Sequence, residues 1–115
     1  FKIPNQNIKI MTPFEDLSPA EFRAKMSADS NAVLLDVRTP EEVAEARIPN
    51  SANIDFRSPD FMTEADELDK SKNYFVYCRS GARSAQACMQ MRSLGFEGTL
   101  TNLKGGILGW DGDKE

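Results

Sequence analysis

The chain has 115 residues, of which 40% are hydrophobic and 28% are charged, and its formal net charge is −4. This length and balance predict a single domain with one buried core. The negative charge argues against broad nucleic-acid binding, and no apolar run approaches the length of a membrane span. Histidine is absent, which excludes Cys-His proteases, Ser-His hydrolases and histidine metal sites.

The two cysteines match neither a disulfide framework nor a zinc site. Any reactive cysteine must therefore be activated by local electrostatics, and we expect neither a metal nor a cofactor. The chain begins at Phe1, as expected of a processed protein or a piece of a longer one. Its compartment cannot be read from the sequence; a cytoplasmic location is slightly favoured over a processed, exported form.

The first predicted elements follow an extended lead-in over residues 1–16. Residues 18–21 combine a serine cap, a proline and a glutamate, which predicts a helix that runs to about Ser27. The continuous apolar run over residues 32–37 predicts a buried parallel strand. Residues 39–42 repeat the pattern of cap and proline and start a second helix.

Strands and helices continue to alternate in the second half of the chain, which predicts a parallel sheet with both faces covered. Ligands bind such sheets at the carboxyl ends of the strands. The predicted elements are a strand over 52–56, a helix over 59–68, strands over 74–78 and 99–103 with a helix over 83–94 between them, a loop or short helix over 105–110, and a frayed acidic tail over 111–115.

The segment from Cys78 to Ser84 lies between a predicted strand and a predicted helix. Backbone N–H groups at a helix start have no partners within the helix, so they can stabilise a thiolate at Cys78. Gly81 allows the loop to turn these groups inward. Arg79 and Arg83 add positive charge. A cysteine at this place is more often a small core residue, but the arginines and the glycine favour a nucleophile.

Several neighbouring residues have two interpretations. Asp36 and Arg38 could line the site, but a structural ion pair is favoured, because buried carboxylates are usually paired. Glu42 could hold an arginine of the loop or only cover its helix. Arg83 could face the substrate or brace the loop, which leaves Arg79 as the better candidate for an external anion. Cys88 could be a resolving thiol, but its apolar helix face favours a core role.

Four segments, in order, resemble the signatures of single-domain rhodaneses, a family of sulfurtransferases. The resemblance implies a three-layer α/β/α domain over residues 17–110 with a five-stranded parallel sheet. It also implies that Cys78 carries a sulfane sulfur as a persulfide, in a substrate-binding loop of Arg79, Ser80, Gly81, Ala82, Arg83 and Ser84. The four segments are Leu34–Glu42, Arg47–Ile54, Tyr77–Ser84 and Asn102–Trp110.

The second of these segments departs from the family pattern. The family usually has Gly-His before Ile-Pro-Gly, whereas this chain has Ala46-Arg47 before Ile48-Pro49-Asn50. We expect little effect on the chemistry, because that histidine is not the base for the nucleophile in this family. Asn50 can adopt the left-handed conformation that a glycine would supply.

The favoured function is transfer of a sulfane sulfur from thiosulfate or a persulfide, through Cys78, to a thiol or to cyanide. The expected partners are thus a small anionic donor and a thiol or protein acceptor, with no nucleic acid and no membrane span. A phosphatase or arsenate reductase is the first alternative, but only four residues separate Cys78 from Arg83, one fewer than in those loops. A non-catalytic interaction module is the second, and it would usually lack the cysteine.

Overall fold

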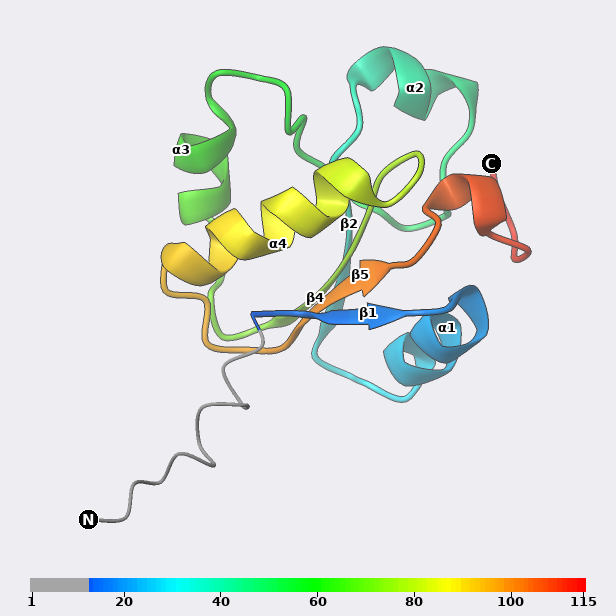
Figure 1. Ribbon diagram of the computed structural model, residues 1–115, viewed down its shortest axis with the longest axis horizontal. Helices are drawn as coiled ribbons and strands as arrows, with labels where there is room; N and C mark the ends of the chain where they lie inside the picture. The colour runs from blue at the N-terminus through cyan, green and yellow to red at the C-terminus, as the bar shows by residue number, and fades with distance from the viewer. Residues whose placement is uncertain (1–12) are drawn as a thin grey trace.

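A parallel sheet of five strands lies at the centre of residues 13–115, the part of the chain that this computed structural model describes (Figure 1). The strand order β1-β5-β4-β2-β3 confirms the predicted α/β fold with a five-stranded parallel sheet. The strands are β1 (Glu15–Leu17), β2 (Ala32–Asp36), β3 (Ala52–Asn53), β4 (Asn73–Tyr77) and β5 (Leu100–Leu103).

The edge strands differ most from the sequence-based prediction. Strand β1 includes two residues assigned above to the lead-in, and it pairs with β5 through Asp16 and Asn102. Glu15 and Asp16 are exposed and Leu17 is only partly buried, so the strand has no apolar signature. Strand β3 ends at Asn53 and is shorter than predicted, although Ile54 still donates its N–H to the Asp36 carbonyl. Residues 1–12 of the lead-in lie outside the described residues.

The helices form where the caps and prolines predicted them. Ser18 and Thr39 each accept a hydrogen bond from the backbone of a glutamate three residues on, and that glutamate side chain accepts one back, so both capping boxes are complete. The helices are α1 (Pro19–Ser27), α2 (Pro40–Glu45), α3 (Phe61–Asp66), α4 (Ala82–Ser93) and the short 3₁₀ helix η2 (Ile107–Gly109). None of those within residues 13–115 is long and apolar enough to cross a membrane.

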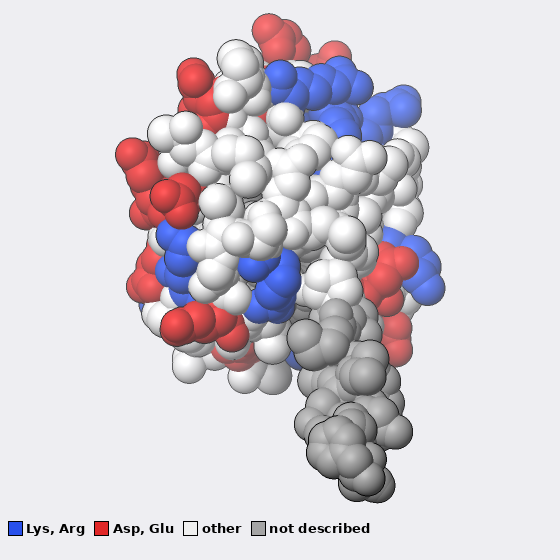
Figure 2. All heavy atoms as spheres, turned by 60° about the vertical axis from the view of Figure 1, so that its left-hand side comes forward, with Lys and Arg blue, Asp and Glu red and all other residues white. Residues whose placement is uncertain are grey.

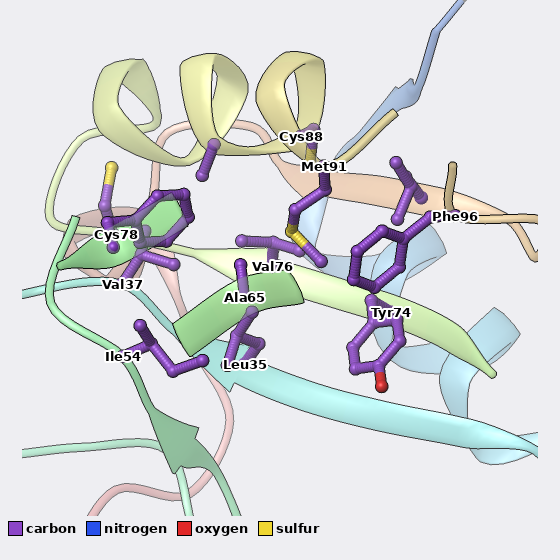
Figure 3. Close-up of a cluster of buried hydrophobic side chains, with 13 residues drawn as sticks. Leu35, Val37, Ile54, Ala65, Tyr74, Val76, Cys78, Cys88, Met91 and Phe96 are labelled. Carbon is purple, nitrogen blue, oxygen red and sulfur yellow. The ribbon is translucent and has the colours of Figure 1, made fainter. Parts of the chain in front are cut away.

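The two faces of the sheet bury separate apolar cores, and this confirms the three-layer arrangement. Strand β4 contributes to both, because successive side chains of a strand point to opposite faces. Tyr74 and Val76 pack beneath α3 and α4, in the cluster shown in Figure 3. Phe75 packs on the other face against Phe22 of α1, with ring centroids 5.4 Å apart, and Phe22 also contacts Trp110.

Residues 111–115 are not frayed, so that expectation was wrong. Arg47 and Glu115 exchange two backbone hydrogen bonds of 2.9 and 2.8 Å, and their side chains form an ion pair. The Trp110 indole N–H donates to the Asp113 carbonyl at 3.1 Å. Acidic composition alone predicted a solvated tail, but these non-local contacts hold it against the domain.

An ion pair between Asp36 and Arg38 lies buried at the carboxyl end of β2. The guanidinium donates to both carboxylate oxygens, with Nη2 2.7 Å from Oδ2 and Nε 3.0 Å from Oδ1. Nη2 also donates to the Ala46 carbonyl at 2.7 Å, which ties the end of α2 to the sheet. The pair confirms the structural interpretation. Asn50 has a φ of 69°, as predicted for a residue in the place of glycine.

We expect Asp36→Ala to lower the free energy of unfolding by about 3–5 kcal/mol, because it leaves the Arg38 charge buried without its partner. Urea unfolding measures the change. The matched control is Glu15→Gln, which removes an exposed ion pair with Lys25 and should cost less than about 1 kcal/mol. Equal losses in the two variants would contradict a structural role for the buried pair.

Candidate active site

The loop from Cys78 to Gly81 joins the end of β4 to the start of α4. Gly81 has a φ of 104°, a conformation that side chains other than glycine rarely adopt, and it lets the chain turn directly into the helix. Cys78 is 1% exposed. Figure 3 shows its sulfur at one end of the apolar cluster, below the first turn of α4. The structure therefore places Cys78 where the sequence predicted it.

Hydrogen-bond donors surround the sulfur of Cys78. The Gly81 N–H donates to Sγ at 3.0 Å, and the Ser84 hydroxyl donates at 3.3 Å. Burial raises the pKa of the Cys78 thiol, but the Ser84 hydroxyl and the amides of Ser84, Gly81 and Ser80 outweigh it, so the pKa lies below its ordinary value. This arrangement favours a thiolate without an imidazole base.

The segment after β5 packs directly against this loop. The N–H groups of Ile107 and Leu108 donate to the carbonyls of Cys78 and Arg79 at 2.9 and 3.1 Å. A Cβ atom on Gly106 would lie 2.3 Å from the Arg79 carbonyl oxygen, so only glycine permits this approach. Gly106 therefore brings the backbone after β5 close to the loop.

Arg83 braces the loop against α2. Its two terminal nitrogens each lie 2.8 Å from an oxygen of the Glu42 carboxylate. Hydrogen bonding from Arg83, aided by Thr39, lowers the pKa of Glu42 to about 2 against the effect of burial. The same pairing raises the pKa of Arg83. Glu42 therefore both caps α2 and anchors the first turn of α4.

Arg79 differs from Arg83 in its surroundings. It is exposed, and it forms no ion pair with any other residue in the part of the chain described. It lines a cavity of about 310 Å³ beside the loop. Its charge is thus available to an external anion, whereas that of Arg83 is already neutralised.

Cys88 lies inside the apolar core under α4 and is fully buried. Burial raises the pKa of its thiol to about 12. A protonated thiol without solvent access is a poor nucleophile, which supports the core role. Across residues 13–115, no cluster of three or more Cys, Asp or Glu side chains is arranged to hold a metal ion.

Asn102 is a site residue that the sequence analysis did not single out. It lies on β5, is 3% exposed, and donates from its amide nitrogen to the Gly81 carbonyl at 3.3 Å and to Asp16 at 3.0 Å. These contacts connect the edge strand β1 to the loop around Cys78. A polar residue inside a buried strand was the only signal, and it did not say which segment the amide would contact.

A family model supports the resemblance stated from the motifs. The model of the rhodanese-like domain matches residues 18–113. The chain belongs to the rhodanese-like domain family. This range contains all four segments that carried the resemblance, including the loop around Cys78.

Relatives and solved structures agree with this membership. The chain is 38% identical to YtwF of Bacillus subtilis over 99 residues, which cover 86% of this chain and 92% of YtwF. It is also 38% identical to a sulfurtransferase of Allochromatium vinosum over 92 residues, covering 79% of this chain and 83% of that protein. A rhodanese-like domain protein of Staphylococcus aureus superposes with a TM-score of 0.73 at 27% identity, covering 87% and 93% of the two chains.

We expect Ser84→Ala to raise the pKa of the Cys78 thiol, because the variant removes a hydroxyl donor to Sγ. The rate of alkylation by iodoacetamide against pH measures the change. Ser80→Ala is the control, since Ser80 acts on Cys78 through its backbone N–H, which the variant keeps. A midpoint that does not move in Ser84→Ala would contradict the assigned hydrogen bond.

The Glu42–Arg83 pair should stabilise the fold above pH 5, and less so in acid. The pKa of Glu42 is lowered from 4.5 to about 2, so the stabilisation, roughly 3 kcal/mol, is lost as pH falls through the folded value. The free energy of unfolding, measured with urea from pH 6 to pH 2, should therefore fall less steeply in Glu42→Gln than in the wild type. Glu45→Gln, on the same helix and outside any ion pair of the described residues, should keep the wild-type slope.

Proposed function

We propose that this rhodanese-like domain is a sulfurtransferase in which Cys78 carries the transferred sulfur. The donor is thiosulfate or a persulfide, and the acceptor is a thiol or cyanide. The observation that carries the proposal is the set of N–H and O–H donors directed at the buried sulfur. Membership of the family and the similarity to a named sulfurtransferase support it.

In the first step, the Cys78 thiolate attacks the outer sulfur of the donor. The S–S bond of thiosulfate breaks, sulfite leaves with the electron pair, and Cys78 gains a terminal sulfur that bears the negative charge. The amides of Ser80, Gly81 and Ser84 stabilise that charge as they stabilise the thiolate. Because these donors favour the thiolate, the step requires no general base.

In the second step, the acceptor attacks the terminal sulfur of the persulfide. A thiolate acceptor becomes a persulfide, cyanide becomes thiocyanate, and the Cys78 thiolate leaves and is restored. Arg79 attracts anionic donors to the loop, because its charge has no partner among residues 13–115. Arg83 contributes indirectly, by holding the first turn of α4 in place through Glu42.

The position of Arg83 argues against the phosphatase alternative. A cysteine-loop phosphatase needs an arginine that donates to the phosphoryl oxygens. Here both terminal nitrogens of the Arg83 guanidinium already donate to the Glu42 carboxylate. The four residues between Cys78 and Arg83 also make a narrow ring of amides. Both features fit a single sulfur atom better than a tetrahedral phosphoryl group.

We expect Cys78 to gain one sulfur atom from thiosulfate. Intact mass spectrometry should show an increase of about 32 Da that dithiothreitol removes. Cys78→Ser should abolish the gain, while Cys88→Ser should retain it, since the Cys88 thiol is buried and protonated.

Aryl phosphates provide the opposing test. The wild-type chain should not hydrolyse them while it consumes thiosulfate. Hydrolysis of aryl phosphate without any uptake of sulfur would sink the sulfurtransferase proposal and promote the phosphatase. Loss of sulfur uptake in Cys88→Ser at unchanged stability would show that one cysteine is not enough.

A further inference from the structure

The cavity beside the loop is partly open to solvent and is lined mainly by three parts of the chain that are distant in sequence. They are α2 with the residue that follows it, the loop and η2 near Cys78, and the segment of residues 111–115. At about 310 Å³ the cavity could hold a small molecule or the end of a larger one. It is lined by Arg38, Glu42, Glu45, Ala46, Arg79, Ile107, Leu108 and Lys114.

Cations that lack partners give this cavity an excess of positive charge. Arg38 is paired with Asp36, and Glu42 is paired with Arg83. That leaves Arg79, Lys114 and Glu45, none of which forms an ion pair within residues 13–115. The cavity is therefore locally positive, although the whole chain carries −4.

Figure 2 shows one face of the molecule, and acidic side chains gather along the left of this view. Lysine and arginine atoms gather at its upper edge, at the height of α2 in Figure 1. The picture also shows acidic side chains along that edge, so the attraction of an anion to the cavity depends on Arg79 and Lys114 themselves.

The segment of residues 111–115 holds Lys114 at the cavity from both sides. At one side Asp111 pairs with Arg23 of α1 at 2.8 Å. At the other, Glu115 exchanges two backbone hydrogen bonds with Arg47, whose side chain also pairs with the Glu115 carboxylate at 2.9 Å. Lys114 immediately precedes Glu115, so these contacts fix its backbone.

The middle of the segment packs on the indole of Trp110. A Cβ atom on Gly112 would lie 2.9 Å from the ring, so the close passage requires glycine. Trp110 is itself 6% exposed and packs on Phe22. The segment is thus fixed at its two ends and its middle, and it presents Lys114 in a defined place rather than on a free chain end.

We propose that the cavity binds an oxyanion group of the sulfur donor or acceptor, and that Lys114 and Arg79 are the cations that hold it. The inference rests on the proposed function and adds to it a residue that determines specificity. The shared chemistry is a sulfonate-like group of thiosulfate or a carboxylate on the acceptor thiol. Arg47 is the positioning residue, because it anchors the segment that carries Lys114.

Binding by the Cys78→Ser chain separates these sources, because that chain cannot form a persulfide. NMR titrations would use thiosulfate, mercaptoacetate as a thiol with a carboxylate, and 2-mercaptoethanol as a neutral thiol. In this background, Lys114→Ala should lower the affinity for one of the two anions roughly three- to ten-fold and leave the affinity for the neutral thiol unchanged. If the thiosulfate complex is weaker, the cavity binds the oxyanion group of the donor. If the mercaptoacetate complex is weaker, it binds the carboxylate of the acceptor.

Two further variants control for charge and for position. Lys72→Ala removes a lysine just before β4, at the opposite end of that strand from Cys78, and should leave the binding of both anions unchanged. Arg47→Ala should weaken the same anion as Lys114→Ala, although Arg47 does not line the cavity. The loss in Lys114→Ala should shrink at high salt, because exposed charges are screened.

Unchanged affinity for both anions in Lys114→Ala would overturn the inference, as would equal losses in Lys72→Ala. Neither result affects the proposed function, which depends on sulfur uptake by Cys78 in the wild-type chain. Conversely, failure of that uptake with anion binding that still depends on Lys114 would reject the sulfurtransferase and retain the oxyanion site.

Discussion

The turn from strand to helix directly after Cys78 is the constraint on which the rest of the site depends. It directs the Gly81 N–H and the Ser84 hydroxyl at a sulfur that is removed from solvent. Burial alone would raise the pKa of the thiol, and the convergence of donors lowers it below its ordinary value instead. The donors belong to the backbone and to the first turn of α4, so the loop must keep its shape for the pKa of the thiol to stay lowered.

Three contacts from different parts of the fold keep that shape. Glu42 on α2 holds Arg83, Gly106 packs its backbone against the loop, and Asn102 on β5 donates to the Gly81 carbonyl. Beneath them, the buried pair of Asp36 and Arg38 ties α2 to the sheet. A rigid support of this kind suits a reaction whose main requirement is a preorganised set of donors around one atom.

The arginines near the loop divide into those that build the site and one that remains available to it. Arg38 and Arg83 are neutralised by carboxylates and act as braces. Arg79 has no such partner within residues 13–115, and Lys114 joins it at the same cavity. The basic groups that brace the loop are thus paired with carboxylates, whereas Arg79 and Lys114 at the cavity are not, among the residues described.

The local features of this protein could be predicted from sequence, whereas its non-local contacts could not. The capping boxes at Ser18 and Thr39, the strand before Cys78 and the left-handed Asn50 each depend on a few neighbouring residues, and motif order indicated the family. The edge strand β1 and the docked segment 111–115 have no local signature, because partners distant in the chain hold them. The sequence therefore determined the position of Cys78 and of the loop that surrounds it. Only the tertiary structure decided which charges are paired and which face the cavity, since that depends on where each side chain meets its partner.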